Sequence, residues 1–477
     1  MKVHIMERRK GMEKGKKKKR FAVPNVFIIL FAMIFVCSIL SYIVPAGTYE
    51  MMELDGRSVV DPDSYHTIEQ TPVSLMQMLT SITRGLQESA QIVFFLFIVG
   101  GAMAVIQSTG ALEAGVGKLA KSLKGKDLII IPIVLALFGL GGAIFGMCEE
   151  SVPLVPLFVA LCLAMGYDSI VGVAIVMIGG AIGWAGEFMN PFCLQVAQGI
   201  SELPPLSGMG LRIALFVTML VVTSLWIMRY ARKVKKDPQL SPMYELDKQR
   251  EDTLDLEHLP KFGGREKAIL IVFLLMIVLL VYGVIELGWY MDEICALFLG
   301  TSIICAIIGK IGFNRYAEVL GKGMMDLATG ALIVGFSKAI VVVLTDGSIL
   351  HVILHGAASV LGVLPPIFSA IGMYIFQNLL NLVVVSGSGQ AALTMPLMAP
   401  LADLVDVTRQ TAVMALSVGN GLSNVLTPVS GFLMAGLALA KVPWEKWAKW
   451  MLPLIGIQFV IGLVFIIIAH VTQYGPF

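Results

Sequence analysis

Residues 420–428, Asn-Gly-Leu-Ser-Asn-Val-Leu-Thr-Pro, interrupt an otherwise apolar helical stretch near the end of the chain. A similar interruption, Gly-Glu-Phe-Met-Asn-Pro, stands at residues 186–191. Proline removes a backbone donor and frees a carbonyl one turn earlier, so each interruption predicts a broken helix. A single break could be a simple kink capped by Asn or Thr. Two breaks at equivalent places favour a site instead, because half-helix ends direct their dipoles toward a bound solute.

A second pair of interruptions precedes the broken helices. The apolar segments 128–147 and 152–167 are joined by Met-Cys-Glu-Glu-Ser, and the segments 366–385 and 391–405 are joined by Ser-Gly-Ser-Gly-Gln. Each pair could be two ordinary crossings with a wet loop. The same break in both halves favours re-entrant hairpins, whose tips lie inside the membrane. Glycines at such a tip let the backbone approach a ligand.

The two halves of the chain also align with each other. Gly100 matches Gly335, and Asn190-Pro191 matches Thr427-Pro428 at nearly the same offset. The distribution of Lys and Arg places the first copy and the second copy in opposite orientations, and a helix at 268–287 supplies the extra crossing. We therefore expect an all-α polytopic membrane protein built from an inverted repeat with two re-entrant hairpins and two broken helices, an arrangement typical of secondary transporters.

The composition agrees with a membrane protein. Of the 477 residues, 57% are hydrophobic and only 14% are charged, whereas about a quarter of the residues in a soluble protein are charged. The apolar residues fall in blocks of about 15 to 22, long enough to cross a bilayer as helices. The six cysteines lie in these blocks without metal-binding spacing, so we interpret them as small buried hydrophobic residues.

Charge sets the expected boundaries and orientation. Residues 1–22 form a basic tail and residues 231–266 a basic linker, and both are expected in the cytoplasm of a bacterium. The first membrane repeat is then expected at 23–230, a linking transmembrane helix at 267–290, and the second membrane repeat at 291–477. The N-terminus of this multi-pass protein of the plasma membrane would be cytoplasmic.

The polar residues at the four interruptions are the candidate substrate-binding or ion-binding residues. A charge at the bilayer centre costs roughly 2.5–3.5 kcal/mol on insertion scales, so an unpaired acid there should have a use. Glu149 and Glu150 could alternatively be an outer-loop pair in water. Lys338 could pair with a substrate carboxylate, form a structural ion pair or snorkel. The candidate set is Glu149, Glu150, Ser151, Glu187, Asn190, Ser386, Gly387, Ser388, Gly389, Gln390, Asn420, Asn424 and Thr427.

Other functional classes find less support in the sequence. An intramembrane hydrolase would need a reactive pair, and Tyr167-Asp168 and residues 386–389 match such protease motifs only faintly. A receptor would need an output domain larger than the polar segment 229–267. His351 and His355 lack a third ligand for a metal. We therefore expect no enzyme activity, no metal site, no cofactor and no nucleic-acid partner.

Several of these motifs together resemble the YfcC family. They are residues 146–150, 166–168, 190–192, 386–391 and 395–403, and the likeness runs over nearly the whole chain after residue 22. That family is grouped with the anaerobic C4-dicarboxylate carriers of the DcuC type and with the ion transporter superfamily. The resemblance implies a scaffold domain, a transport domain that moves like an elevator, and a homodimer.

The leading hypothesis is a secondary transporter of a small charged metabolite. A basic amino acid is the favoured substrate, because Glu149, Glu150 and Glu187 outnumber Lys338 near the proposed site. It would be exchanged in the arginine/ornithine manner that the resemblance implies, or its transport would be driven by Na⁺ or H⁺. The alternative is a carrier of C4-dicarboxylates or other small carboxylates. The groups that would hold the carboxylate are then Ser386, Ser388, Asn424 and Thr427.

Overall fold

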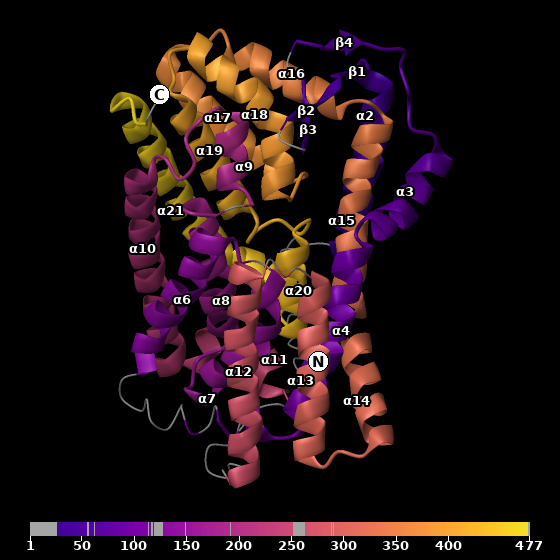
Figure 1. Cartoon of the computed structure of the whole chain (residues 1–477), viewed down its shortest axis with the longest axis vertical. Helices are drawn as coiled ribbons and strands as arrows, with labels where there is room; N and C mark the ends of the chain where they lie inside the picture. The colour runs from indigo at the N-terminus through magenta and orange to yellow at the C-terminus, as the bar shows by residue number, and fades with distance from the viewer. Residues whose placement is uncertain are drawn as a thin grey trace, which may run out of the picture.

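The computed structural model describes residues 26–475 except 55–56, 62, 113, 116–117, 119–126, 148, 191, 251–262, 288 and 290. The described part is almost entirely helical (Figure 1). Its strands form two antiparallel pairs, which we call the ribbon: β1 (Gly47–Thr48) with β4 (His66–Thr67), and β2 (Met51–Leu54) with β3 (Arg57–Val60). Residues 1–22, the expected basic tail, lie outside the described residues.

The first half of the chain contains two long outer helices, the bent helix pair α3–α4, a hairpin and a broken helix. In chain order these are α2 (Val26–Ile43), α3 (Leu75–Glu88), α4 (Ala90–Ser108), η1 (Asp127–Ile129), α6 (Ile130–Phe145), η2 (Glu149–Leu154), α7 (Val155–Ala164), α8 (Ser169–Ala185), α9 (Leu194–Ile200) and α10 (Met209–Lys236). Three elements then connect the halves: η3 (Pro238–Leu240), α11 (Tyr244–Lys248) and α12 (Gly264–Glu286). The helix α10 thus continues into the segment expected as the linker.

The second half repeats the order of these elements. It consists of α13 (Met291–Gly309), α14 (Phe313–Asp326), α15 (Ala328–Asp346), α16 (Leu350–Leu361), α17 (Pro366–Asn381), α18 (Gly387–Leu404), α19 (Arg409–Ser423), α20 (Gly431–Leu439) and α21 (Trp444–Val471). The α17–α18 hairpin corresponds to the α6–α7 hairpin, and the broken pair α19–α20 corresponds to α8–α9.

Contacts between the halves are reciprocal. The helices α3 and α14, which we call the arms, each pack on a helix of the other half: α3 packs on α15, and α14 packs on α4. In the same way, α2 packs on α15 and α13 packs on α4. Figure 1 shows α3 and the α17–α18 hairpin toward one end of the molecule, and α14 and the α6–α7 hairpin toward the other. The helices of each half thus pack on helices of the other half. The inverted repeat stays a prediction; a two-fold relation between the halves is one arrangement that would produce this exchange of partners and ends.

Local signals begin and end the helices at the interruptions. Gly146 ends α6 with φ of +70°, a conformation that favours glycine. Asp168 begins α8 by accepting a hydrogen bond from the Val171 N–H at 3.0 Å. Ser386 begins α18 in the same way through the Gly389 N–H at 3.2 Å. The caps at Gly146 and Ser386 hold helix ends at the interruptions, whereas Asp168 fixes the opposite end of α8, where Ser241 also donates to it.

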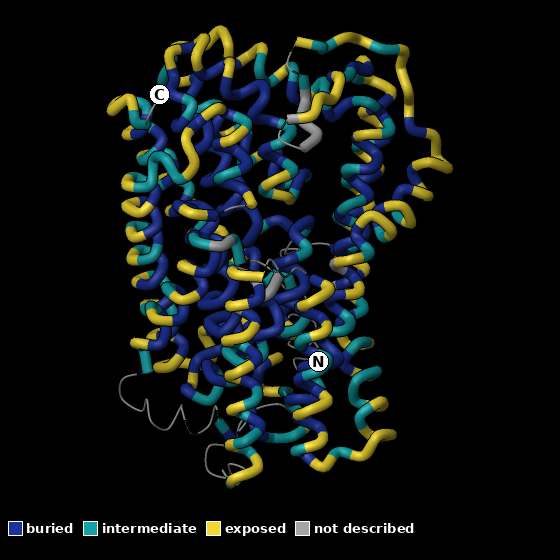
Figure 2. The backbone as a smooth tube through the Cα atoms, viewed as in Figure 1, coloured by how far each residue is buried: buried dark blue, intermediate teal, exposed yellow. Residues whose placement is uncertain are grey.

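Among the described residues, six helices are long and apolar enough to cross a membrane, or seven if the bent pair α3–α4 is one span. The outer helices expose large apolar side chains, such as Leu275 and Val278 on α12, which is the pattern of a lipid-facing surface. In contrast, every residue of α8 is buried, and Figure 2 shows buried residues concentrated along the middle of the molecule. The broken helices are therefore the core around which the rest is packed.

Candidate functional site

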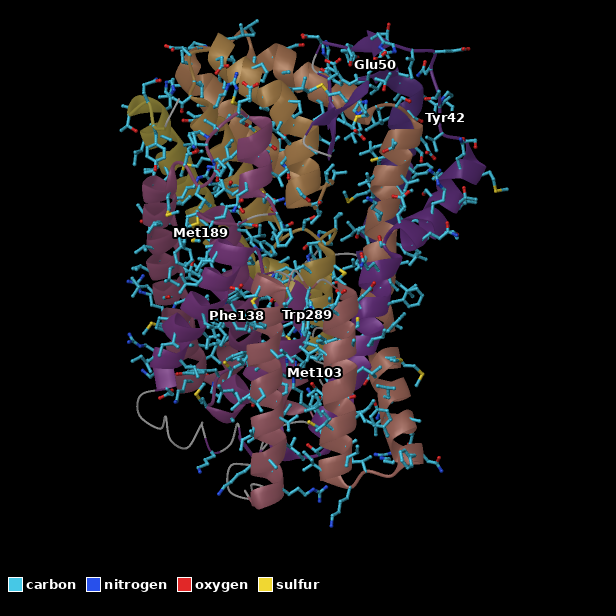
Figure 3. The ribbon with its side chains drawn as sticks, in the orientation of Figure 1. Tyr42, Glu50, Met103, Phe138, Met189 and Trp289 are labelled. Carbon is cyan, nitrogen blue, oxygen red and sulfur yellow. The ribbon has the colours of Figure 1, made fainter. Side chains whose placement is uncertain are left out.

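A cavity of about 420 Å³ lies where the interruptions meet. One wall is formed by Glu88 and Ser89 at the α3–α4 bend and by one face of α15, including Lys338. The opposite wall is formed by the end of α6, the tip of the second hairpin and both helix breaks. Figure 3 places Met189, in the break after α8, at a level between Glu50 near one end and Met103 toward the other. The site is therefore far from both ends of the molecule.

The structure brings most of the candidate residues together. The cavity is lined by Glu187, Asn190, Ser386, Gly387, Ser388, Asn420 and Asn424. Gln390 and Thr427 are buried behind this lining, and the Gly389 N–H is held by Ser386. Ser151 is buried within η2. The backbone of Glu149 and Glu150 belongs to η2, but their side chains lie outside the described residues.

Glu187 and Asn190 form the first-half side of the site. The Asn190 Nδ2 donates to Oε2 of Glu187 at 2.6 Å, and its Oδ1 accepts from the Phe192 N–H at 2.9 Å. An added Cβ on Gly146 would lie 2.6 Å from that Oδ1. Glycine is therefore needed for the end of α6 to approach the break, and the break in turn fixes the orientation of a fully buried carboxylate.

A network of buried amides forms the second-half side. The Asn381 Nδ2 donates to Ser423 Oγ at 2.7 Å and to Asn424 Oδ1 at 3.0 Å, and the Asn420 Nδ2 donates to Asn381 Oδ1 at 2.8 Å. The network continues through Gln390, whose Nε2 donates to Gln377 Oε1 at 2.7 Å. A satisfied polar network of this kind fixes side-chain orientations in a low-dielectric interior.

Indole N–H groups bind carbonyls that the interruptions leave free. Trp184, which lines the cavity, donates to the Met147 carbonyl at 3.0 Å. Trp444 donates to the Leu426 carbonyl at 3.0 Å, and Trp447 donates to the Val425 carbonyl at 2.8 Å. Both halves thus use tryptophan to satisfy the irregular backbone, as a membrane interior requires.

The sequence analysis missed three residues that shape the site. Asn381 and Gln377 anchor the amide network from within α17, and Arg212 on α10 is buried beside Glu187. The available signal was the same for all three: a polar or charged residue inside a long apolar helix, which is costly without a partner. The same criterion singles out Lys338 on α15.

The structure adds one acid, Glu88, and one base, Arg212, to the charges expected near the site. Lys338 Nζ lies 3.6 Å from Glu88 Oε2, and both side chains are about half exposed at the cavity wall. Arg212 Nη1 donates to the Glu187 backbone carbonyl at 3.5 Å. The added acid and base therefore leave the net charge near the site unchanged.

The family model of the C4-dicarboxylate anaerobic carriers, DcuC, matches residues 23–471. The chain belongs to the DcuC family. Over 97% of its length it is 35% identical to 99% of an Escherichia coli protein named "Putative basic amino acid antiporter YfcC". It is also 28% identical, again over 97% of its length, to 100% of an uncharacterized protein of Haemophilus influenzae.

Membership of the DcuC family identifies the chain as a membrane transporter of a small molecule, and the resemblance found in the sequence is confirmed. Among solved structures, the YdaH transporter of Alcanivorax borkumensis is 14% identical and covers 95% of this chain and 100% of its own, with a TM-score of 0.44. At that level of similarity the details of this DcuC family site have to be argued from its own residues.

Proposed function

We propose that this DcuC family member exchanges basic amino acids, in the manner of arginine and ornithine, across the bacterial plasma membrane. The observation that carries the proposal is Glu187, a fully buried acid at a helix break that belongs to the lining of the central cavity. The name of the Escherichia coli relative supports the same substrate class. The cytoplasmic N-terminus, the inverted orientation of the halves and a homodimeric assembly are further parts of this proposal.

The two walls of the cavity could hold the two ends of such a substrate, because one wall contains Glu187 and the other contains Lys338. The cationic side chain would approach Glu187, and the α-carboxylate would approach Lys338, displacing Glu88. Ser386 and Ser388 at the hairpin tip supply hydroxyl groups between them. Charge-assisted hydrogen bonds at both ends of the solute would favour a molecule that carries both charges.

The same walls suggest how transport occurs. The helices α3, α4, α14 and α15 pack on one another across the halves, while the two hairpins and the broken helices form the opposite side of the cavity. We infer that the second group moves against the first as an elevator and carries the polar tips with it. The two pairs of half-helices then expose the site to alternate sides of the membrane.

The alternative substrate is a C4-dicarboxylate or another small carboxylate, as the family description suggests. Lys338 would bind one carboxylate, and the hydroxyl and amide groups of Ser386, Ser388 and Asn424 would bind the other. In that case Glu187 would repel the substrate and would instead carry the coupling Na⁺ or H⁺.

Uptake of labelled arginine into proteoliposomes loaded with ornithine tests the proposal. Excess ornithine outside should compete, and excess succinate should not. Glu187→Gln should lower arginine uptake by roughly tenfold or more, since losing one partner of a buried charge interaction costs about 2–5 kcal/mol. Glu318→Gln on α14, where the side chain is exposed, is the matched control. Uptake that succinate blocks and ornithine does not would support the alternative.

A further inference from the structure

Arg212 has no role in the transport scheme described so far. It lies on α10, and its side chain is only 1% exposed, although a guanidinium stays charged at every physiological pH. Its Nη1 donates to Ser417 Oγ at 3.1 Å and to the Glu187 backbone carbonyl at 3.5 Å. Its Nε and Nη2 have no hydrogen-bond partner among the described residues. A buried charge in this condition needs an opposite charge nearby.

The acid beside Arg212 is Glu187, whose backbone carbonyl the guanidinium contacts. Packing of α10 on α8 brings the two residues together. Asn190 occupies Oε2 of the carboxylate, and Oε1 has no hydrogen-bond partner among the described residues. The guanidinium thus lies against a buried acid that is itself a lining residue of the cavity.

We propose that Arg212 is a resident counter-cation, which neutralises Glu187 when the site holds no cationic substrate and so allows the empty transporter to change conformation. The proposal rests on the proposed function, because it assigns Arg212 the charge that a bound basic amino acid supplies in the loaded state. A lone buried carboxylate would oppose movement through the membrane interior. With Arg212 present, the empty and the loaded sites both contain a cation beside Glu187.

Two kinds of flux separate this positioning role from a merely structural one. Exchange moves a loaded site in both directions, whereas net uptake also requires the empty site to return. In Arg212→Gln, the ratio of net arginine uptake into empty proteoliposomes to arginine exchange should fall roughly tenfold or more, the size of effect expected for about 1.4 kcal/mol. Arg212→Lys should largely preserve the ratio, as should Arg229→Gln, an exposed position on the same helix.

A double-mutant cycle in thermal stability tests the charge pairing without any substrate. Arg212→Gln should lower the melting temperature of the purified protein, and adding Glu187→Gln should restore part of the loss, because the uncompensated carboxylate is then gone. Additive effects would overturn the inference. So would an unchanged flux ratio in Arg212→Gln, or a wild type that exchanges arginine without any net uptake. If the wild type carries no basic amino acid, the proposed function fails and the stability cycle alone decides the role of Arg212.

Discussion

Asn381 shows how single residues define the site. It joins the hairpin helix α17 to the break after α19 by donating to both Ser423 and Asn424 and accepting from Asn420. All of these polar groups are buried. The position of the lining amides therefore depends on a residue that does not itself line the cavity.

Asn381→Ala should lower the free energy of unfolding by about 1–3 kcal/mol, the cost of leaving buried polar partners unsatisfied. The measurement is thermal or denaturant unfolding of the purified protein in detergent. Asn378→Ala is the control, because Asn378 lies on the same helix, is only partly buried and donates to the Tyr374 carbonyl of the preceding turn. Equal losses in the two variants would contradict the assigned role of Asn381.

At the residue scale, the sequence alone identifies the polar residues that interrupt helices. It does not identify the partners of the polar residues within helices. Asn190 and Asn424 stand beside glycines and prolines, so their positions are visible without a structure. Arg212 and Asn381 sit in long apolar stretches, and their partners Glu187 and Asn420 are distant in the chain. A pairing of that kind is created by the fold and has no local pattern.

At the scale of elements, the broken helices α8 and α19 cross closely because glycine permits it. A Cβ on Gly421 would lie 2.3 Å from the Ala185 backbone nitrogen. Gly421→Ala should therefore destabilise the protein by about 1–3 kcal/mol through overpacking, as measured by unfolding. Gly456→Ala on α21 has open space around the new methyl group, so it should be neutral or slightly stabilising. A neutral Gly421→Ala would contradict the close crossing.

The ribbon is held on α16 by two histidines. His351 Nδ1 accepts from the Tyr49 N–H at 3.2 Å, the Tyr49 hydroxyl bonds to His355 Nδ1 at 3.0 Å, and the Tyr65 ring stacks on His355 at 3.7 Å. Burial lowers the pKa of His351, so the docked ribbon favours the neutral ring. Acidification must then weaken docking.

Hydrogen exchange tests this pH dependence. The stabilisation is fully present above the pKa of an undocked histidine, about 6.5, and is lost as the pH falls below that value, because the protonated Nδ1 no longer accepts from Tyr49. Protection of the Tyr49 amide, corrected for intrinsic exchange, should decrease between pH 7.5 and 5.5. His351→Ala should lack protection at both pH values, and protection that is independent of pH in the wild type would contradict the prediction.

For the elements, the sequence predicted the hairpin arms and helix breaks closely, because glycine and proline mark their ends. The expected segments 366–385 and 391–405 correspond to α17 and α18. The strand pairs were not foreseen, since their strands are only two to four residues long and carry no sustained alternation.

For the whole molecule, the proposed elevator predicts which parts move relative to each other. Val341 on α15 and Val385 at the second hairpin tip line the cavity from the two sides of the proposed movement, so a short bismaleimide link between cysteines at these positions should stop transport. A link between cysteines at Arg84 and Asp346, which form an ion pair between α3 and α15, should leave transport intact. Both pairs belong in a background without the native cysteines, and uptake is the measurement. Transport that survives the first link would rule out movement at this cavity.

The helical membrane architecture was predictable from the sequence, because the same order of interruptions occurs in each half. The reciprocal packing of α3 on α15 and of α14 on α4 was not predictable, since either arm could have covered its own half. Which half each arm covers depends on which apolar helix faces remain free once the other helices of both halves have packed.

The tryptophans at the interruptions give the protein an optical reporter. The Trp184 indole lines the cavity and is tied to the Met147 carbonyl at the first hairpin tip, so a solute that enters changes the polarity around its ring. Trp444 and Trp447 are tied to the break in the other half and respond to a different movement. The chain has six tryptophans. Emission from a variant that keeps only Trp184 would therefore report filling of the chamber, and emission from one that keeps only Trp444 and Trp447 would report rearrangement of its far side.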